Sequence, residues 1–568
     1  MVAGRASFEI QTYHDGHWIT SDYRETELTA RAQAKILFSM PDAEGVRVVK
    51  NWTRSDGVVT ENVLYTAMRD PVAPKVTIVP IDESPCCRET SEYYRWESRA
   101  TMNRLFRKYV DQVFLTPTEL IHHYKSLKRI QEVETLFPAA VDRIATIQSR
   151  HTGEESRSRR DEIFRALAQM TDRARRAEDY PRLPKLSGNN FEKLCERMEG
   201  AVPPGEADYF SLVVLSRELV KHRNWLGKLD RLTEFARPDQ RREALTLLDG
   251  VFADIFGVAS ALQDVLGYQQ NLAEAICAMI DLCEGRFQAD RSDARDQVSA
   301  IAPLIADGRF AETRNALMDR AIRQLGGVQP LSRNDPSREE EAFLRVARRL
   351  LGADHLIGAG AAAEALTQRA ISFQEAGGRS GLRRAIGIVV KLLGDPVPAV
   401  SYLVELAGSP LGRDLSQDIG GALQTVLGVG QLDDLVAPSM RVVDKLSRVT
   451  GIYERVLLAT GLPAEGREGV LAHIDGLLSA YVRREGVIEK LDHPDAGLRD
   501  RAVRLIEFCA AGYLPAGSRA VEIARGRVVD LLRQPNFEQR FVDGLSDPDR
   551  RESALRSFHA LLARAGFG

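Results

Sequence analysis

The segment closest to a known chemical motif is Gly358-Ala-Gly360-Ala-Ala-Ala363. These letters fit the dinucleotide-binding fingerprint G-x-G-x-x-A, in which glycines let the backbone approach a pyrophosphate at a helix N-terminus. The fingerprint also needs a hydrophobic strand before the glycines and a surrounding βαβ unit. Residues 353–357 are too few for that strand. We therefore expect these small residues to serve close helix packing.

Two cysteines and two histidines are the candidate metal ligands. Cys277 and Cys283 are six residues apart, which places them on different faces of a helix, and no second cysteine or histidine pair follows them. The adjacent His122 and His123 point about 100° apart on a helix, so they cannot chelate one ion together. We expect core cysteines, one packed and one solvent-facing histidine, and no metal or cofactor. A phosphorylatable histidine is the remaining alternative.

Aromatic and basic residues near the N-terminus form a candidate ligand site. Trp18 and Trp52, with Arg47 and Arg54, are the residue types with which sheets bind single-stranded nucleic acids. The alternative is that the tryptophans belong to the core of a small sheet. The sequence has no Walker-type phosphate loop, His-Glu-x-x-His helix or Gly-x-Ser-x-Gly elbow, so we assign no catalytic residue.

Composition limits the classes of partner. The 568 residues exceed what a single hydrophobic core supports. The 77 basic and 80 acidic residues nearly cancel, so the chain has no large net charge that would attract nucleic acid or an anionic membrane. Six scattered cysteines are not a disulfide framework. Without a signal-peptide pattern or a long uncharged apolar stretch, we expect a soluble, cytoplasmic protein with no integral membrane segment.

The pattern of residues predicts a mainly α-helical chain with a small α+β domain in front. Residues 1–68 show strand, strand, helix, strand, strand, with turn chemistry at Asp15-Gly16 and Ser55-Asp56-Gly57. The predicted organisation is a ββαββ domain at 1–68, a proline-containing linker at 69–90, a helical region at 91–178, a linker at 179–206 and an irregular helical-repeat body at 207–568.

Helix signals dominate after residue 91. Thr116, Pro117 and Glu119 form a capping box that opens a helix predicted to reach about residue 134. Continuous helices are also predicted over 208–228 and 238–265. At the other end of the chain, Asp547 and Pro548 predict a helix start.

The segment Leu491-Asp-His-Pro-Asp-Ala-Gly-Leu-Arg-Asp-Arg-Ala-Val-Arg-Leu505 resembles the HEAT-type helical repeat. Its Asp-Pro, arginine and alanine stand in the arrangement with which the second helix of that repeat commonly opens, and fainter copies occur at 237–245 and 547–555. The resemblance implies stacked helix pairs whose extended surface binds other proteins.

The helix predicted over 498–509 is the candidate docking element. Its apolar stripe consists of Leu498, Ala502, Leu505, Ile506 and Cys509. Phe508 lies off this stripe on the same side as Arg501 and Arg504, and an aromatic flanked by arginines is typical of an interface hot spot. The alternative is that Phe508 packs against a neighbouring helix pair.

Taken as a whole, the sequence favours a non-enzymatic cytoplasmic scaffold or adaptor that binds other proteins through helical surfaces. Two alternatives remain open: an enzyme whose site is assembled from dispersed residues, and a nucleic-acid-associated regulator that uses the N-terminal sheet.

Overall fold

The structure, a computed structural model, describes residues 5–14, 17–40, 45–53, 59–68, 77–133, 135–333, 335–352, 355–373 and 378–567. Contacts divide the chain into two compact units, neither of which is one continuous segment. The first comprises Met1–Ser84, Arg104–Gln112 and Lys128–Arg165, and the second comprises Pro85–Asn103, Val113–Leu127 and Ala166–Gly568. Each unit is described by itself.

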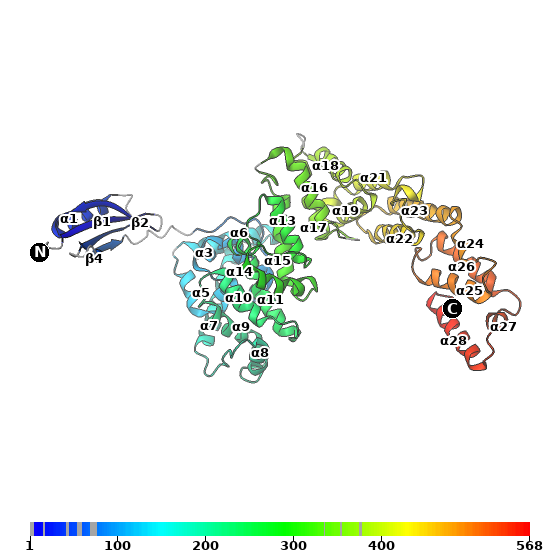
Figure 1. Cartoon of the computed structure of the whole chain (residues 1–568), viewed down its shortest axis with the longest axis horizontal. Helices are drawn as coiled ribbons and strands as arrows, with labels where there is room; N and C mark the ends of the chain where they lie inside the picture. Colours follow the sequence, from blue (N-terminus) through cyan, green and yellow to red (C-terminus); the bar gives the residue numbers. More distant parts are fainter. Residues whose placement is uncertain are drawn as a thin grey trace. The chain divides into compact units, whose positions relative to one another are not determined.

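The first unit contains the predicted ββαββ arrangement (Figure 1). Its elements are β1 (Arg5–His14), β2 (His17–Arg24), α1 (Glu27–Ser39), β3 (Gly45–Thr53) and β4 (Val59–Met68). The strands form one antiparallel sheet in the order β2-β1-β3-β4. The two turn segments expected at Asp15-Gly16 and Ser55-Asp56-Gly57 lie outside the described residues.

Alternation along the strands gives this sheet one face that packs on α1. Side chains two residues apart point to the same face, and the buried core between sheet and helix consists of Phe8, Ile10, Val46, Val48, Ala30 and Ala34. Residues in between, such as Glu9 and Arg47, belong to the opposite face.

The rest of the chain is helical, as the sequence predicts. Its helices are η1 (Thr90–Tyr94), α2 (Trp96–Leu105), α3 (Arg107–Val113), α4 (Pro117–His122), α5 (Tyr124–Gln131), α6 (Leu136–Thr152), α7 (Ser156–Glu178), α8 (Phe191–Glu199), α9 (Ala207–Leu219), α10 (Trp225–Phe235), α11 (Arg242–Phe256), α12 (Ala259–Leu266), α13 (Leu272–Cys283), α14 (Ser292–Ala306) and α15 (Ala311–Gly326). They continue with η2 (Pro336–Arg338), α16 (Glu339–Leu350), α17 (Ala359–Ile371), α18 (Gly378–Leu393), α19 (Pro396–Gly408), α20 (Pro410–Arg413), α21 (Ser416–Leu427), η3 (Leu432–Asp434), α22 (Val442–Leu458), α23 (Ala464–Arg484), α24 (Val487–Leu491), α25 (Leu498–Ala510), α26 (Arg519–Leu532), α27 (Phe537–Phe541) and α28 (Pro548–Arg564).

The predicted helix starts are confirmed, whereas three predicted lengths are wrong. Thr116 and Glu119 make the reciprocal capping box of α4, and Asp547 caps α28. The helix expected to continue to about residue 134 ends at His122, because His123 is extended. The helix expected over 208–228 is interrupted before Asn224, which caps α10. That expected over 238–265 is two helices, α11 and α12, bent by 94°.

Helices of the second unit pack mainly on helices close to them in sequence. Successive contacts join α13 to α15, α15 to α17, α17 to α19 and α19 to α22, and then run through α23 and α26 to α25 and α28. Such neighbour-to-neighbour contacts are the pattern of a helical array. Helix lengths vary along the series, so the array is irregular.

Several helices in this unit have their N-termini capped by a carboxylate from another helix. Asp249 of α11 accepts hydrogen bonds from the backbone N–H groups of Glu312 (2.8 Å) and Thr313 (2.9 Å) in the first turn of α15. Asp475 of α23 likewise accepts from the N–H groups of Arg519 and Ala520, which open α26. We call these contacts distal caps. They satisfy N–H groups that a helix cannot satisfy itself, and they join two helices at a fixed position.

A buried ion pair joins α4 to α10. Lys228 Nζ donates to a carboxylate oxygen of Glu119 and to the carbonyl oxygen of Leu219 (2.9 Å), and both charged side chains are fully buried. Burial raises the pKa of the Glu119 carboxyl group and lowers the pKa of the Lys228 ammonium group. Each charge is therefore compensated chiefly by the other.

A second buried network is centred on Arg99 of α2. Its guanidinium group pairs with Asp254 of α11 at 3.0 Å and with Glu312 of α15, and it donates to the carbonyl oxygen of Gly250. Asp254 also accepts from the N–H group (2.8 Å) and the hydroxyl group (2.6 Å) of Thr118, which makes it a distal cap of α4. One arginine thus connects four helices through two carboxylates.

Among the described residues, no single helix has the length and apolar composition needed to cross a membrane, and only the bent pair of α11 and α12 passes that test when the two are taken together.

Candidate functional site

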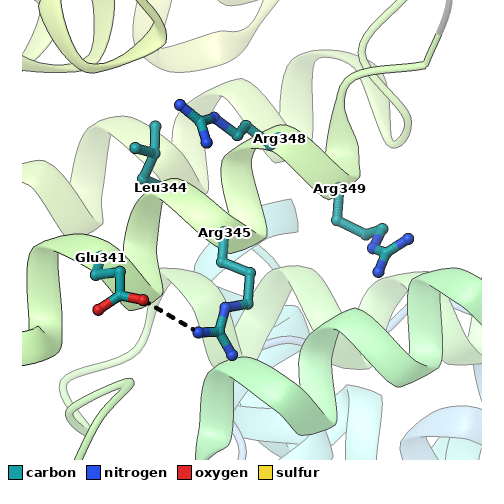
Figure 2. Close-up of a pocket in the computed structure, with 5 residues that line it drawn as sticks. All are labelled: Glu341, Leu344, Arg345, Arg348 and Arg349. Atoms are coloured by element: carbon teal, nitrogen blue, oxygen red, sulfur yellow. Dashed lines mark hydrogen bonds and ion pairs between the residues drawn. The ribbon is translucent and has the colours of Figure 1, made fainter.

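A groove of about 370 Å³ lies along α16 in the second unit. It is lined by Glu341, Leu344, Arg345, Arg348 and Arg349 (Figure 2). In Figure 2, Leu344 and Arg348 project to one side of the helix, whereas Arg345 extends to the other side and contacts Glu341. Three of the five lining side chains are guanidinium groups, which makes this groove a candidate anion-binding site.

The sequence of α16 explains why the arginines gather there. The first turn contains three glutamates and the last turn contains Arg348 and Arg349, which complements the helix dipole. One stripe is buried and consists of Ala342, Phe343, Val346, Ala347 and Leu350. Arg345, Arg348 and Arg349 lie off this buried stripe. Arg345 and Arg349, at i and i+4, each pair with a carboxylate of α13, whereas Arg348 projects to the other side of the helix.

The three arginines differ in their partners. Arg345 is 3.2 Å from Glu274 of α13 and 3.4 Å from Glu341, and Arg349 is 3.2 Å from Asp281 of α13. The guanidinium group of each arginine is nearly half exposed, so each pair stabilises the fold by at most about 1 kcal/mol. Arg348 is exposed and has no ion-pair or hydrogen-bond partner among the residues that the structure describes.

A second hollow, of about 160 Å³, adjoins the groove and shares Glu341 and Arg345 with it. Its remaining lining residues are Gln270, Asn271, Glu274, Ser332, Asp335, Arg338 and Ala342. Both acidic and basic side chains therefore line this surface. We call the two hollows together the α16 groove. Its guanidinium groups present the paired donors that bind carboxylates and phosphates in a bidentate manner.

The structure brings two of the four predicted N-terminal site residues together. The Arg47 guanidinium carbon lies 4.5 Å from the centroid of the Trp18 ring, and the centroid of the Tyr13 ring lies 5.0 Å from that of Trp18. Trp52 lies elsewhere, 40 % exposed beside Lys50, so it is not a core residue. Arg54 lies outside the described residues.

A buried carboxylate supports this face of the sheet. Glu9 accepts hydrogen bonds from the side chains of Gln11 (2.8 Å), Thr20 and Asn51 (3.0 Å), and Gln11 in turn accepts from Arg47 (2.6 Å). Burial by itself would raise the pKa of Glu9, but the three hydrogen bonds outweigh it and lower the pKa below its usual value. The charge of Glu9 is therefore stabilised in the folded state, and this support is lost as pH falls through that lowered pKa.

The predicted C-terminal docking residues require a correction. Phe508 is only 7 % exposed, and its ring packs 5.6 Å from that of Tyr513, so it is a packed residue and not an exposed interface hot spot. Arg501 donates to Asp492 at 2.6 Å, and Asp492 also accepts from Arg527. Of the three predicted residues, only Arg504 is exposed. A docking role for Arg504 stays a prediction.

We expect Arg501→Glu and Arg504→Glu to behave differently. Arg501 is 18 % exposed, and its replacement places two carboxylates together at the buried Asp492. We expect this variant to lose about 2–4 kcal/mol of local stability. Arg504→Glu should stay within about 0.5 kcal/mol of the parent protein. Hydrogen exchange in α25 and α26 measures the stability loss in each variant. Equal losses in the two variants would contradict the role of Arg501 as a partner of the buried Asp492.

The remaining candidate motifs have structural roles. Gly358 has φ of +85° and caps α17, where a Cβ atom would lie 2.9 Å from Ile322. At Gly360 a Cβ atom would lie 3.3 Å from the carbonyl oxygen of Glu405 in α19. The prediction of close packing on small residues is therefore confirmed.

Three of the four candidate metal ligands lie within the protein core. Cys277 and Cys283 are buried, and burial raises the pKa of the Cys283 thiol to about 12. His122 packs between Tyr94 and Tyr209, and burial lowers its pKa to about 3. His123 is half-buried.

Sequence reasoning missed the α16 groove. The signal that could have identified it is the i, i+3, i+4 spacing of arginines opposite an apolar stripe. That pattern is typical of many solvated helix faces, and only the structure shows a hollow beside it. A comparison with family models, with curated proteins and with solved structures finds no match to this chain.

Proposed function

We propose that this chain is a non-enzymatic, cytoplasmic scaffold or adaptor that binds another protein through its helical surface. The observation that carries the proposal is the α16 groove, a hollow in the helical array that contains an exposed arginine with no partner among the described residues. Arrays of packed helices provide extended surfaces of the kind that proteins use for partners. The resemblance to HEAT-type repeats agrees with this role and stays a prediction.

The proposal is tested by affinity capture of the full-length protein from its native cell, with chemical cross-linking and mass spectrometry. A scaffold should return one protein in stoichiometric amount, with cross-links to defined helices. Recovery of no protein partner, together with turnover of a small molecule by the purified chain, would support the alternative of an enzyme with a dispersed site.

A nucleic-acid-associated role is the second candidate, and Trp18, in contact with both Tyr13 and Arg47, favours it. Base stacking on an aromatic residue contributes about 1–3 kcal/mol per base. If this role holds, Trp18→Ala should weaken binding of a labelled single-stranded oligonucleotide at least about fivefold, whereas Trp52→Ala, the matched control, should leave it unchanged. Absence of oligonucleotide binding by the parent protein at low salt would exclude this candidate.

A further inference from the structure

We propose that the α16 groove binds an acidic segment of a partner protein in which carboxylates flank an apolar side chain. This inference rests on the proposed scaffold function and specifies the chemistry of the partner. It follows from three properties of the groove: one arginine with no described partner, two partly exposed arginines in ion pairs, and a single apolar side chain on the same side of α16 as the first arginine.

The first property concerns the positive charge that the groove offers to a carboxylate. Arg348 lines the groove, is exposed and has no described partner, so a carboxylate can pair with it without breaking an existing contact. Arginine forms two parallel hydrogen bonds with a carboxylate, which gives the contact a defined geometry. Arg348 is therefore the expected anchor.

The second property is that the neighbouring arginines are only partly covered by their partners. The ion pairs of Arg345 with Glu274 and of Arg349 with Asp281 are both 3.2 Å long, and in each the guanidinium group is nearly half exposed whereas the carboxylate is more covered. A further carboxylate can therefore approach the exposed part of either guanidinium group and add to the contact at Arg348.

The third property distinguishes an acidic peptide from a nucleic acid. Leu344 is half-buried in the groove and provides an apolar contact for a side chain of the partner. None of the described residues that line the two hollows is aromatic, so the groove offers no platform for base stacking. A carboxylate at Arg348 beside an apolar contact at Leu344 therefore fits an acidic peptide better than a nucleic acid.

The test uses the full-length protein and a fluorescein-labelled synthetic peptide of sequence Glu-Glu-Leu-Glu-Asp-Glu-Leu-Glu, with binding followed by fluorescence anisotropy at low salt. We expect saturable binding that weakens as ionic strength rises, because exposed charge pairs are screened. Arg348→Glu should weaken binding at least about tenfold, and Leu344→Asp should weaken it as well. A peptide with lysine in place of every acidic residue should not bind.

Arg242→Glu is the matched control, because Arg242 of α11 is also an exposed arginine of the second unit with no described side-chain partner. We expect it to leave peptide affinity within about twofold of the parent protein, since its surface effect is small. Equal loss in the Arg348 and Arg242 variants would overturn the inference, and so would absence of peptide binding. Displacement of the peptide by a single-stranded oligonucleotide of equal charge would assign the groove to nucleic acid instead.

The two levels of the proposal fail in different ways. Cross-links from a captured partner to helices other than α13 and α16 would contradict the acidic-segment site while leaving the scaffold function intact. Failure to capture any protein would contradict the scaffold function even if the synthetic peptide binds.

Discussion

Lys228→Met should destabilise the region around α4 and α10 by about 3–5 kcal/mol, the largest effect we expect from any single substitution in this chain. Lys228 and Glu119 are both fully buried, and each neutralises the other. Methionine removes the ammonium group and leaves an uncompensated carboxylate in the core. Hydrogen exchange in peptides from α4 and α10 measures the loss as a change in the local opening free energy.

The second substitution Glu119→Gln should recover a large part of this loss. Glutamine carries no charge, and its amide oxygen can still accept from the N–H group of Thr116, as the capping box requires. Lys221→Met is the matched control, because Lys221 is 67 % exposed and pairs with Glu218 on the surface. We expect the control to change stability by less than about 1 kcal/mol.

The loss in Lys228→Met should also depend on pH. Burial raises the folded-state pKa of Glu119 above its unfolded value, so protonation favours the folded state. The loss of stability relative to the parent protein should be largest at neutral pH and should shrink as pH falls through the raised pKa of Glu119. A deficit that is the same at about pH 7 and about pH 5 would contradict the assignment to a buried carboxylate.

Arg99→Met should have the second-largest effect, also about 3 kcal/mol or more. The substitution leaves Asp254, which is fully buried, without its cation and removes the contact to Glu312. Because Asp254 also caps α4, we expect faster hydrogen exchange in α2, α4 and α11 together. Slowed exchange in α15 alone, with the other helices unchanged, would be incompatible with one shared network.

Two further variants separate charge loss from a general effect of substitution. Adding Asp254→Asn to Arg99→Met removes the stranded charge while keeping an oxygen that can accept from Thr118, so it should restore part of the stability. Arg95→Met, next to α2, changes an arginine that is 66 % exposed and should be nearly neutral.

The parts of the fold that local chemistry determines could be predicted from the sequence. Strand alternation and helix spacing predicted the ββαββ arrangement and the helical remainder, since each depends on residues within one element. The starts of α4 and α28 were also predictable, because the capping residues are adjacent to the helices that they cap. Helix ends were harder to predict, as the extended His123 in an otherwise helical pattern shows.

Features that depend on two packed helices were harder to predict. The position of Phe508 off the main stripe of α25 left two alternatives, exposure or packing against a neighbouring helix pair. The structure buries Phe508 in a helix that packs on both α26 and α28. The α16 groove depends likewise on where α13 places Glu274 and Asp281. Neither neighbour can be identified from the spacing of residues on one helix.

The distal caps also constrain how this array can change by insertion or deletion. Arrays of self-contained repeats can gain or lose a unit, because each unit satisfies its own backbone groups. Here, removal of the segment carrying α11 would leave the first turn of α15 without Asp249, and loss of α23 would take Asp475 from α26. Duplicating or excising one helix pair therefore separates a capping carboxylate from the helix that it caps. We expect shortened versions of this chain to remain well folded only when both helices of a distal cap are kept or removed together.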